Sequence, residues 1–313
     1  ALKEGFVHYE EEKFVGDLMG RDMTMIRYVR DLRSSQFPED AGNSAHQIWP
    51  EEYIGDPGDS MYSKTTYYKG GEIIRMIEVL IGTEKYREGS MLYFDRFDGK
   101  AASIDDLVSC FQEASGMDLS QFKLWFNQVG TPKCDVTSSY DEASREFTLN
   151  VRQECTREPK HVLNFPLLMG LVGPEGEAVA LELKGESGGA HDLGRGLLNI
   201  TQAEQTFVFQ NVPKGAVPSL LRGFSAPVIC NYDYSNAELM HLMKHDEDGF
   251  NLYEAGQRIV RMELARLAKI HQGGEELSLY SVDKETLSAF DSIIFNLMKT
   301  DPTLAAEMLV LPG

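Results

Sequence analysis

The spacing of apolar residues changes its period twice along this chain, and these changes restrict the folds that it can adopt. Helical spacing dominates residues 1–131, two-residue alternation takes over across about 132–229, and helical spacing returns over 230–313. A length of 313 residues exceeds what one ordinary core organises, so we expect two or three domains. The sequence therefore predicts a multidomain protein with α and β parts, in the order helical, β, helical.

Local signals mark the ends of the expected helices. The segment EIIRMIEVLIGTE at 72–84 carries apolar residues on one face, and its Gly82 is typical of a helix C-cap. Capping boxes are matched by SIDD at 103–106 and by SNAE at 235–238. Further helices are predicted over about 252–270 and 284–298. The last residues, LAAEMLVLPG, predict a helix that ends with its apolar face exposed.

The middle of the chain reads as short strands separated by glycine and proline. The segment REFTLNV at 145–151 alternates apolar and polar residues. The segment NFPLLMGLVGPEGEAVALEL at 164–183 reads as two strands around a GPEG turn, and TFVFQNV at 206–212 reads as another strand. Such a series predicts a small β-sandwich over 132–229.

The charge of the chain excludes some classes of partner. The net charge is −19, from 49 acidic and 30 basic residues. Such a charge repels phosphate backbones and anionic lipid. No stretch approaches the roughly 18 apolar residues that a membrane-spanning helix needs. We therefore expect no nucleic-acid partner and no membrane partner.

Cysteine and histidine spacing gives little sign of a metal site. The four cysteines are scattered and form no C-x-x-C pair. They are expected to be buried free thiols in a reducing compartment, which favours the cytoplasm. His241 and His245 are four apart in HLMKH, a spacing that can chelate zinc, but Leu242 stands where a general base would be needed. A solvated helix pair is the expected interpretation.

The first residues, ALKEGFVHYEEEKF, have helical spacing and place Glu4 and Glu11 one heptad apart on one face. A carboxylate on a helix, beside an aromatic residue and small residues, can be a metal ligand. Most such residues are solvated surface charges, so the residues alone favour that interpretation of Glu4.

Five segments, in order and across nearly the whole chain, resemble the aminopeptidase N type of zinc metallopeptidase (the gluzincins). LKEG resembles the segment that supplies the third zinc ligand, and QFPEDAGNSAH resembles a QF-x-ED-x-x-x-x-AH motif. TTYYKGGEIIRM resembles a V-Y-x-K-G-x-E-V-I-R-M motif. DGKAASIDDLVSCFQEASGMDLSQFKLWFNQVGTP and VPSLLRGFSAPV resemble the ends of the catalytic domain and of the β-domain after it.

The resemblance implies a division into three domains. Residues 1–131 would be the helical second part of a thermolysin-like catalytic domain. Residues 132–229 would be an Ig-like β-sandwich, and residues 230–313 would be the first helices of a C-terminal helical domain.

The resemblance also implies a zinc cofactor. In the family, two histidines of an H-E-x-x-H motif and a later glutamate hold one zinc ion, and the glutamate between the histidines acts as general base. Glu4 matches the later glutamate. The sequence contains no H-E-x-x-H motif. We therefore expect the chain to start within an active site and to need an upstream segment as its partner. By itself it is expected to keep no zinc and to be inactive.

The remaining site residues also follow from the resemblance. Alignment of the K-G pair places Tyr67, rather than Tyr68, on the catalytic tyrosine that stabilises the oxyanion. Tyr62 and Asp59 fall at the pocket for the first side chain of the substrate. Glu11 either orients a zinc-bound histidine or is a surface charge in the acidic run 10–12. Without the resemblance, Tyr67 would be taken as a core tyrosine.

These observations predict part of a zinc-dependent aminopeptidase that hydrolyses N-terminal residues from peptide substrates. The alternative is a non-catalytic binding or scaffold module built on the β-sandwich and the helices.

Overall fold

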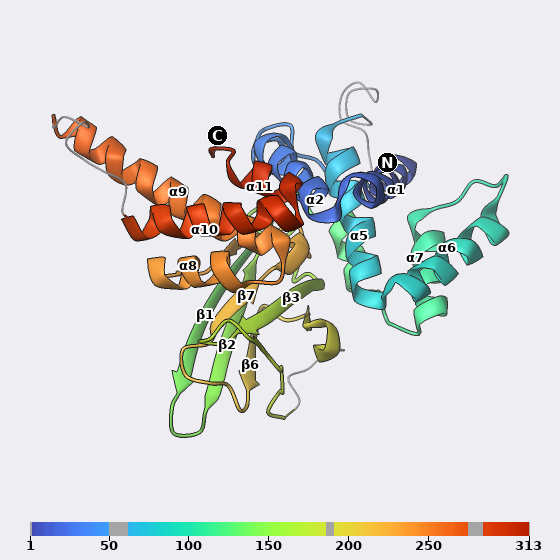
Figure 1. Cartoon of the computed structure of the whole chain (residues 1–313). Coiled ribbons are helices and arrows are strands. Elements are labelled where there is room, and N and C mark those ends of the chain that lie inside the picture. The colour runs from blue at the N-terminus through green and yellow to red at the C-terminus, as the bar shows by residue number, and fades with distance from the viewer. Residues whose placement is uncertain (1, 50–61, 186–190, 275–283, 313) are drawn as a thin grey trace.

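The computed structural model describes residues 2–49, 62–185, 191–274 and 284–312, apart from the side chains of Leu2, Glu285 and Ser292. Figure 1 shows one group of helices, α1 to α7, beside a block of strands, with helices α8 to α11 packed across the top of the strands. The predicted multidomain α and β architecture is confirmed.

The first group of helices is built around α5, which has ten of its twelve residues buried. Two short π-helical turns, η1 and η2, interrupt the helical path, and a 3-10 turn, η3, closes the group. The elements are α1 (Leu2–Met19), α2 (Arg21–Asp31), η1 (Leu32–Gln36), α3 (Phe37–Ala41), η2 (Thr65–Lys69), α5 (Gly70–Ile81), α6 (Thr83–Phe97), α7 (Ile104–Ser115) and η3 (Phe122–Phe126).

The predicted helix ends are present. Helix α7 begins with a capping box in which Ser103 Oγ accepts from Asp106 N at 3.2 Å and Asp106 Oδ2 accepts from Ser103 N at 2.8 Å. Helix α5 ends at Gly82, whose φ of +83° is a conformation that a side chain disfavours. Both features satisfy backbone groups that helix ends leave without partners.

The strands form two sheets that face each other as an Ig-like sandwich. One sheet has the order β6-β2-β1-β8, and the other has β4-β3-β5 with β7 also paired to β3. Phe147, Leu149 and Val151 of β2 point into the core, as their alternation predicted. The strands are β1 (Lys133–Asp141), β2 (Glu146–Glu154), β3 (Phe165–Val172), β4 (Ala178–Val179), β5 (Leu197–Ile200), β6 (Glu204–Phe209), β7 (Val217–Leu220) and β8 (Ile229–Asn231).

The sandwich is docked firmly against the first helices. Arg75, in the middle of α5, donates to the backbone oxygens of Gly223 (3.3 Å) and Phe224 in the turn after β7. Trp125 Nε1 donates to Asn164 O at 2.7 Å, just before β3. The buried cores of the two parts are therefore continuous.

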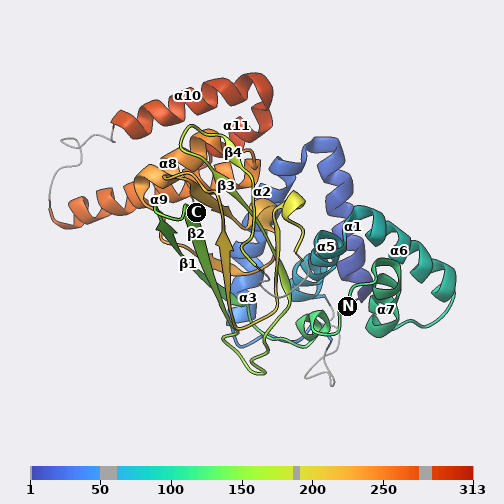
Figure 2. The same ribbon diagram turned by 90° about the horizontal axis from the view of Figure 1, so that it is seen from below.

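The last helices are α8 (Asn236–His245), α9 (Gly249–Gln272), α10 (Lys284–Thr300) and α11 (Pro302–Met308). The expectation that the last residues expose an apolar face is wrong for the helix itself, because Leu304, Ala305 and Met308 are buried. Leu309, Val310 and Leu311, which follow the helix, are exposed. Helix α11 instead lies against α2 and α9, and Figures 1 and 2 show it folded back toward the first helices.

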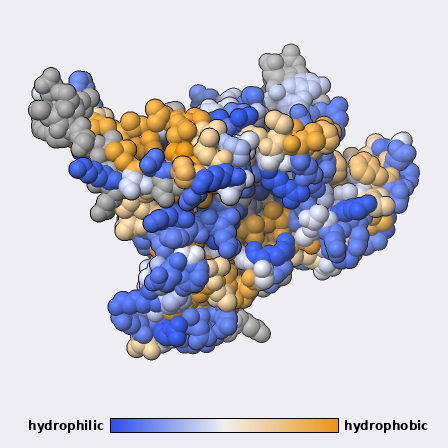
Figure 3. Space-filling model, viewed as in Figure 1, coloured by the Kyte–Doolittle hydropathy of each residue, from blue (hydrophilic) through white to orange (hydrophobic). Residues whose placement is uncertain are grey.

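Glu307 at the end of α11 accepts from Arg27 Nε at 2.6 Å and from Arg30 at 3.2 Å, both on α2. Apolar side chains are exposed elsewhere on the layer formed by helices α8 to α11, and Figure 3 shows them gathered over α9 and α10. They include Met262, Leu264, Leu287, Phe295 and Met298. Among the described helices, none is both long and apolar enough to cross a membrane.

Candidate functional site

Helix α1 and the start of α5 cross with their backbones in contact. A Cβ atom on Gly5 would lie 2.7 Å from the carbonyl carbon of Gly70, and one on Gly70 would lie 3.2 Å from Gly5 Cα. The first distance is too short for any side chain, so this approach requires glycine at residue 5. Helix α1, which carries Glu4 next to Gly5, thus lies against the η2 turn that carries Tyr67.

Glu4 is buried at this crossing. The residue is 5% exposed, and its Oε1 lies 3.4 Å from Lys3 Nζ. The surface-charge interpretation therefore does not describe it. A buried carboxylate needs compensating charge or hydrogen bonds. The role of Glu4 as a metal ligand stays a prediction.

The η2 turn is held by the QFPED segment. Glu39 accepts from the backbone N–H groups of Thr65 (2.8 Å, Oε1) and Lys64 (3.3 Å, Oε2) at the start of the turn. Gln36 Nε2 donates to Thr65 Oγ1 at 3.4 Å. A π-helical turn is uncommon and is often found at functional sites. The motif thus fixes the backbone that presents Tyr67.

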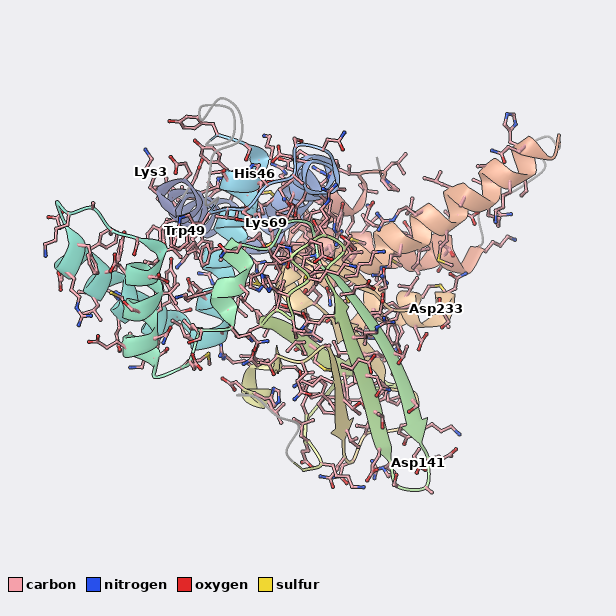
Figure 4. The ribbon with its side chains drawn as sticks, turned by 180° about the vertical axis from the view of Figure 1, so that it is seen from behind. Lys3, His46, Trp49, Lys69, Asp141 and Asp233 are labelled. Atoms are coloured by element: carbon pink, nitrogen blue, oxygen red, sulfur yellow. The ribbon has the colours of Figure 1, made fainter. Side chains whose placement is uncertain are left out.

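The end of the turn is anchored by a fully buried ion pair. Lys69 Nζ lies 2.9 Å from Asp40 Oδ2 and also donates to Gln128 O (3.0 Å) and Gly130 O (3.2 Å). Asp40 Oδ1 accepts from Gly130 N at 2.9 Å. Figure 4 shows Lys69 where the first helices meet the strands, far from the tip of the sandwich at Asp141.

The two adjacent tyrosines have different surroundings. The Tyr68 ring stacks on Tyr28 at 5.2 Å, lies 4.8 Å from the His8 ring and has Lys64 Nζ over it at 5.0 Å. Tyr67 meets His8 edge-on at 6.2 Å, and both tyrosines are half-buried. The Tyr68 ring thus has more aromatic and cationic neighbours, and the choice of Tyr67 stays a prediction.

The other residues implied by the resemblance are less closely gathered. Tyr62 is 61% exposed, and Asp59 lies outside the described residues. His46 bonds Ser63 Oγ through Nε2 at 2.7 Å, and Ser63 Oγ accepts from Thr66 N at 3.1 Å. His46 therefore supports the same turn as Glu39.

Glu11 is exposed, and its carboxylate lies near His8, whose ring meets that of Tyr67. Its Oε2 lies 3.8 Å from His8 Nδ1. Burial lowers the pKa of His8, and the charge of Glu11 opposes this. Both interpretations of Glu11 stay predictions.

Sequence reasoning missed a group of buried charges beside this crossing. Arg75 pairs with Glu72 on α5, and one carboxylate oxygen of the half-buried Glu12 on α1, Oε2, is enclosed nearby. Burial, reinforced by the charge of Glu72, raises the pKa of Glu12 to about 8, although Arg75 opposes it. Glu12 lies one heptad after Gly5, on the face that crosses α5, so a heptad count from Gly5 would have found it.

The residues fit a metal site only in part. Within the described ranges, no group of three His, Cys, Asp or Glu side chains is placed to hold a metal ion. His241, in the third part of the chain, instead bonds the backbone oxygen of Gly173 in the sandwich through Nε2 at 2.8 Å. Glu4 therefore stays the ligand that the resemblance implies, and a carboxylate suits a borderline cation such as zinc.

Three family models cover almost the whole chain. Residues 1–127 match the Peptidase family M1 domain, residues 130–233 match a domain of unknown function with an Ig-like fold, and residues 236–313 match one described as ARM repeats. This order agrees with the architecture described above.

Known aminopeptidases match over the same length. Aminopeptidase N of Escherichia coli (strain K12) is 39% identical over all of this chain and 35% of its own length. Aminopeptidase N of Haemophilus influenzae is 35% identical, with the same coverage. The crystal structure of Legionella pneumophila aminopeptidase A in complex with aspartic acid has a TM-score of 0.76 and 25% identity, over 99% of this chain and 32% of that one.

Residues 1–127 therefore match the M1 family of peptidases. Within this family, the similarity of the chain from end to end is to the aminopeptidases N, and the chain spans about a third of the length of these relatives. The resemblance inferred from the five motifs is confirmed.

The buried ion pair gives a first prediction. Asp40→Ala leaves the Lys69 ammonium buried without its counter-charge and should lower the free energy of unfolding by about 3–5 kcal/mol, measured by denaturant titration. Replacing both residues, as in Asp40→Ala with Lys69→Met, should recover part of this loss. The matched control Glu142→Ala breaks the exposed pair with Lys214 and should change stability little. Equal effects of the two single variants would contradict the proposed role of the buried pair.

Glu12 gives a second prediction. Its folded pKa of about 8 lies above its ordinary value of 4.5, so the folded state keeps a proton that the unfolded state releases. Stability should therefore fall as the pH rises from about 4.5 to 8. Glu12→Gln mimics the neutral form and should be more stable than the wild type at pH ~9, by on the order of a few kcal/mol, and nearly equal to it at pH ~5.

The control for this pH experiment is Glu88→Gln, which removes an exposed carboxylate of α6 that pairs with Lys85. Its stability difference from the wild type should be the same at both pH values. A Glu12→Gln difference that does not change with pH would show that Glu12 is not the buried acid responsible.

Proposed function

We propose that this chain supplies part of the active site of a zinc-dependent aminopeptidase, which removes residues from the N-terminus of peptides. The observation that carries the proposal is the glycine crossing, where the helix that carries a buried Glu4 lies against the turn that presents Tyr67. Homology to aminopeptidases N over the whole chain supports the same reaction.

Glu4 is proposed as one zinc ligand. The other two ligands would be the histidines of an H-E-x-x-H segment that this sequence does not contain. When bound, the zinc ion acts as a Lewis acid that polarises the peptide carbonyl and activates water. One carboxylate cannot hold zinc against water, so the chain taken by itself is proposed to be inactive.

Tyr67 is proposed to stabilise the developing charge. Its phenol hydroxyl would donate a hydrogen bond to the carbonyl oxygen of the substrate as that oxygen becomes negative. Such a donor works best when it is fixed before the reaction, and the contacts of Glu39 and Lys69 hold the turn at both ends. Tyr62 and Asp59 are proposed to border the pocket for the first side chain of the peptide.

The three-part division at 1–131, 132–229 and 230–313 is proposed to separate these roles. The first part carries the catalytic residues, the sandwich supports α5 from below, and the last part begins a helical domain. A binding or scaffold module remains the alternative, but it gives no reason for a buried carboxylate on the helix that lies against the Tyr67 turn.

Substitution of the two tyrosines tests the catalytic assignment. In the full-length enzyme, Tyr67→Phe should lower kcat by about 10²–10³-fold with little change in KM, because only the transition state loses a hydrogen bond. Tyr68→Phe is the matched control and should change kcat by no more than a few fold. Similar losses in both variants, or a larger loss for Tyr68→Phe, would reverse the assignment.

Metal content tests the ligand assignment separately. Glu4→Gln in the full-length enzyme should remove most of the bound zinc, measured by metal analysis after dialysis. Glu11→Gln should weaken zinc binding by roughly 10–100-fold if Glu11 orients a histidine ligand, and not at all if it is a surface charge. Glu88→Gln, which removes an exposed carboxylate of α6, is the control. If the Glu4→Gln variant keeps its full zinc content, Glu4 is not a zinc ligand.

A further inference from the structure

Two of the four cysteines face each other across neighbouring strands. Cys134 of β1 and Cys230 of β8 are direct partners in the parallel register of these strands. Neighbouring strands lie about 4.8 Å apart. This separation falls within the roughly 4.4–6.8 Å between Cα atoms that a disulfide spans. The backbone therefore needs little movement to join the two sulfur atoms.

The side chains of the two cysteines project to the same side of the sheet. The next pair in the register, Asp135 and Asn231, is joined on the other face by a hydrogen bond of 2.7 Å from Asn231 Nδ2 to Asp135 Oδ1. Successive residues of a strand alternate between faces, so the cysteines share the opposite one. Their thiols therefore face each other across the two strands.

Cys230 is the accessible member of the pair. Cys134 is fully buried, whereas Cys230 is partly exposed. Cys230 borders a cavity of about 300 Å³ between β8 and the last helices, and it also borders a more open hollow beside Asp233. Figure 4 marks this position at Asp233, where the chain leaves the sandwich for α8.

The same cavity is lined by arginines that favour a thiolate. Arg33 and Arg258 both border it. Interaction with the Cys134 thiol lowers the pKa of Cys230, and these two arginines act in the same direction, against the effect of burial. The same interaction raises the pKa of Cys134. Cys230, which is also the more accessible of the two, is therefore the better nucleophile of the pair.

The other two cysteines provide a contrast within the same molecule. Cys110 and Cys155 are both buried. Burial raises the pKa of Cys110, and it raises that of Cys155 to about 11. Neither has a thiol partner on a neighbouring strand among the described residues.

We propose that Cys134 and Cys230 form a redox-active dithiol, in which Cys230 reacts with a hydroperoxide and Cys134 then closes a disulfide between β1 and β8. This site is independent of the peptidase chemistry proposed above. The disulfide would join β1, which follows the Gly130 backbone bound by Asp40, to β8, which leads into α8.

The proposed chemistry takes two steps. The thiolate of Cys230 attacks one oxygen of the hydroperoxide, the O–O bond breaks, and the departing oxygen takes a proton and leaves as water or an alcohol. Cys230 is now a sulfenic acid. The sulfur of Cys134 then attacks the sulfur of Cys230, its proton goes to the departing hydroxide, and water leaves. The two cysteines together lose two electrons, which reduce the peroxide.

The test uses the reduced full chain and an equimolar amount of hydrogen peroxide. Intact mass should fall by the mass of two hydrogen atoms, and a peptide map should join the peptides that carry Cys134 and Cys230. Before oxidation, alkylation of Cys230 should be at least about 10-fold faster than alkylation of Cys155. In denaturant, all four cysteines should react at similar rates, which controls for their sequence surroundings.

Two variants separate the roles of the pair. Cys134→Ser should leave a sulfenic acid on Cys230 that a dione reagent traps, with no loss of two hydrogen atoms. Cys155→Ser is the matched control and should close the disulfide as the wild type does.

The wild-type measurements alone decide the matter if Cys134→Ser fails to fold. The proposal is overturned if no disulfide joins Cys134 to Cys230, if Cys230 is oxidised further to a sulfinic acid instead, or if Cys110 or Cys155 reacts as fast as Cys230.

Discussion

The buried pair of Lys69 and Asp40 is the contact on which the candidate site depends. Two charges removed from water are tolerated only when each has partners with good geometry, and here the remaining hydrogen bonds go to the backbone at residues 128 and 130. One ion pair thus fixes three pieces of chain: the helix after the first π-turn, the turn that carries Tyr67, and the stretch that enters the sandwich. None of these could shift without stranding a charge.

The glycine crossing fixes a second feature of the site, the distance between α1 and α5. The backbones of α1 and α5 are in contact and leave no room for a side chain at Gly5. The short distance between the helices therefore requires a residue without a Cβ atom at this position. Glu4 and Glu12 are carried into low-dielectric surroundings by the same approach. The short K-E-G and K-G-G motifs therefore encode a spacing between helices, in addition to the residues that they place there.

Periodicity predicted the regular elements well and the buried polar ones poorly. Helices α5, α9 and α10 and strands β2, β3 and β6 were found because one face of each is apolar and the other polar, or because turn residues bound them. Strands β5 and β7 are buried at every residue, so they show no alternation to detect. Helix α11 was misjudged because its partners on α2 are almost the whole chain away. The site residues came from motif order, since no local pattern tells that Glu4 is buried or that Arg75 reaches the sandwich.

The contacts of α2 have a consequence for how the chain folds. Arg27 and Arg30 of α2 meet Glu307, and Arg33 meets Glu254 at 2.7 Å, across separations of 280, 277 and 221 residues. Contacts between such distant positions form late, because a long loop must be closed before they add any stability. During synthesis α2 is made before α9 and α11, so its ion pairs with them cannot form until both later helices have been made. The part of α2 that packs on α9 and α11 is therefore covered late, although it lies early in this sequence.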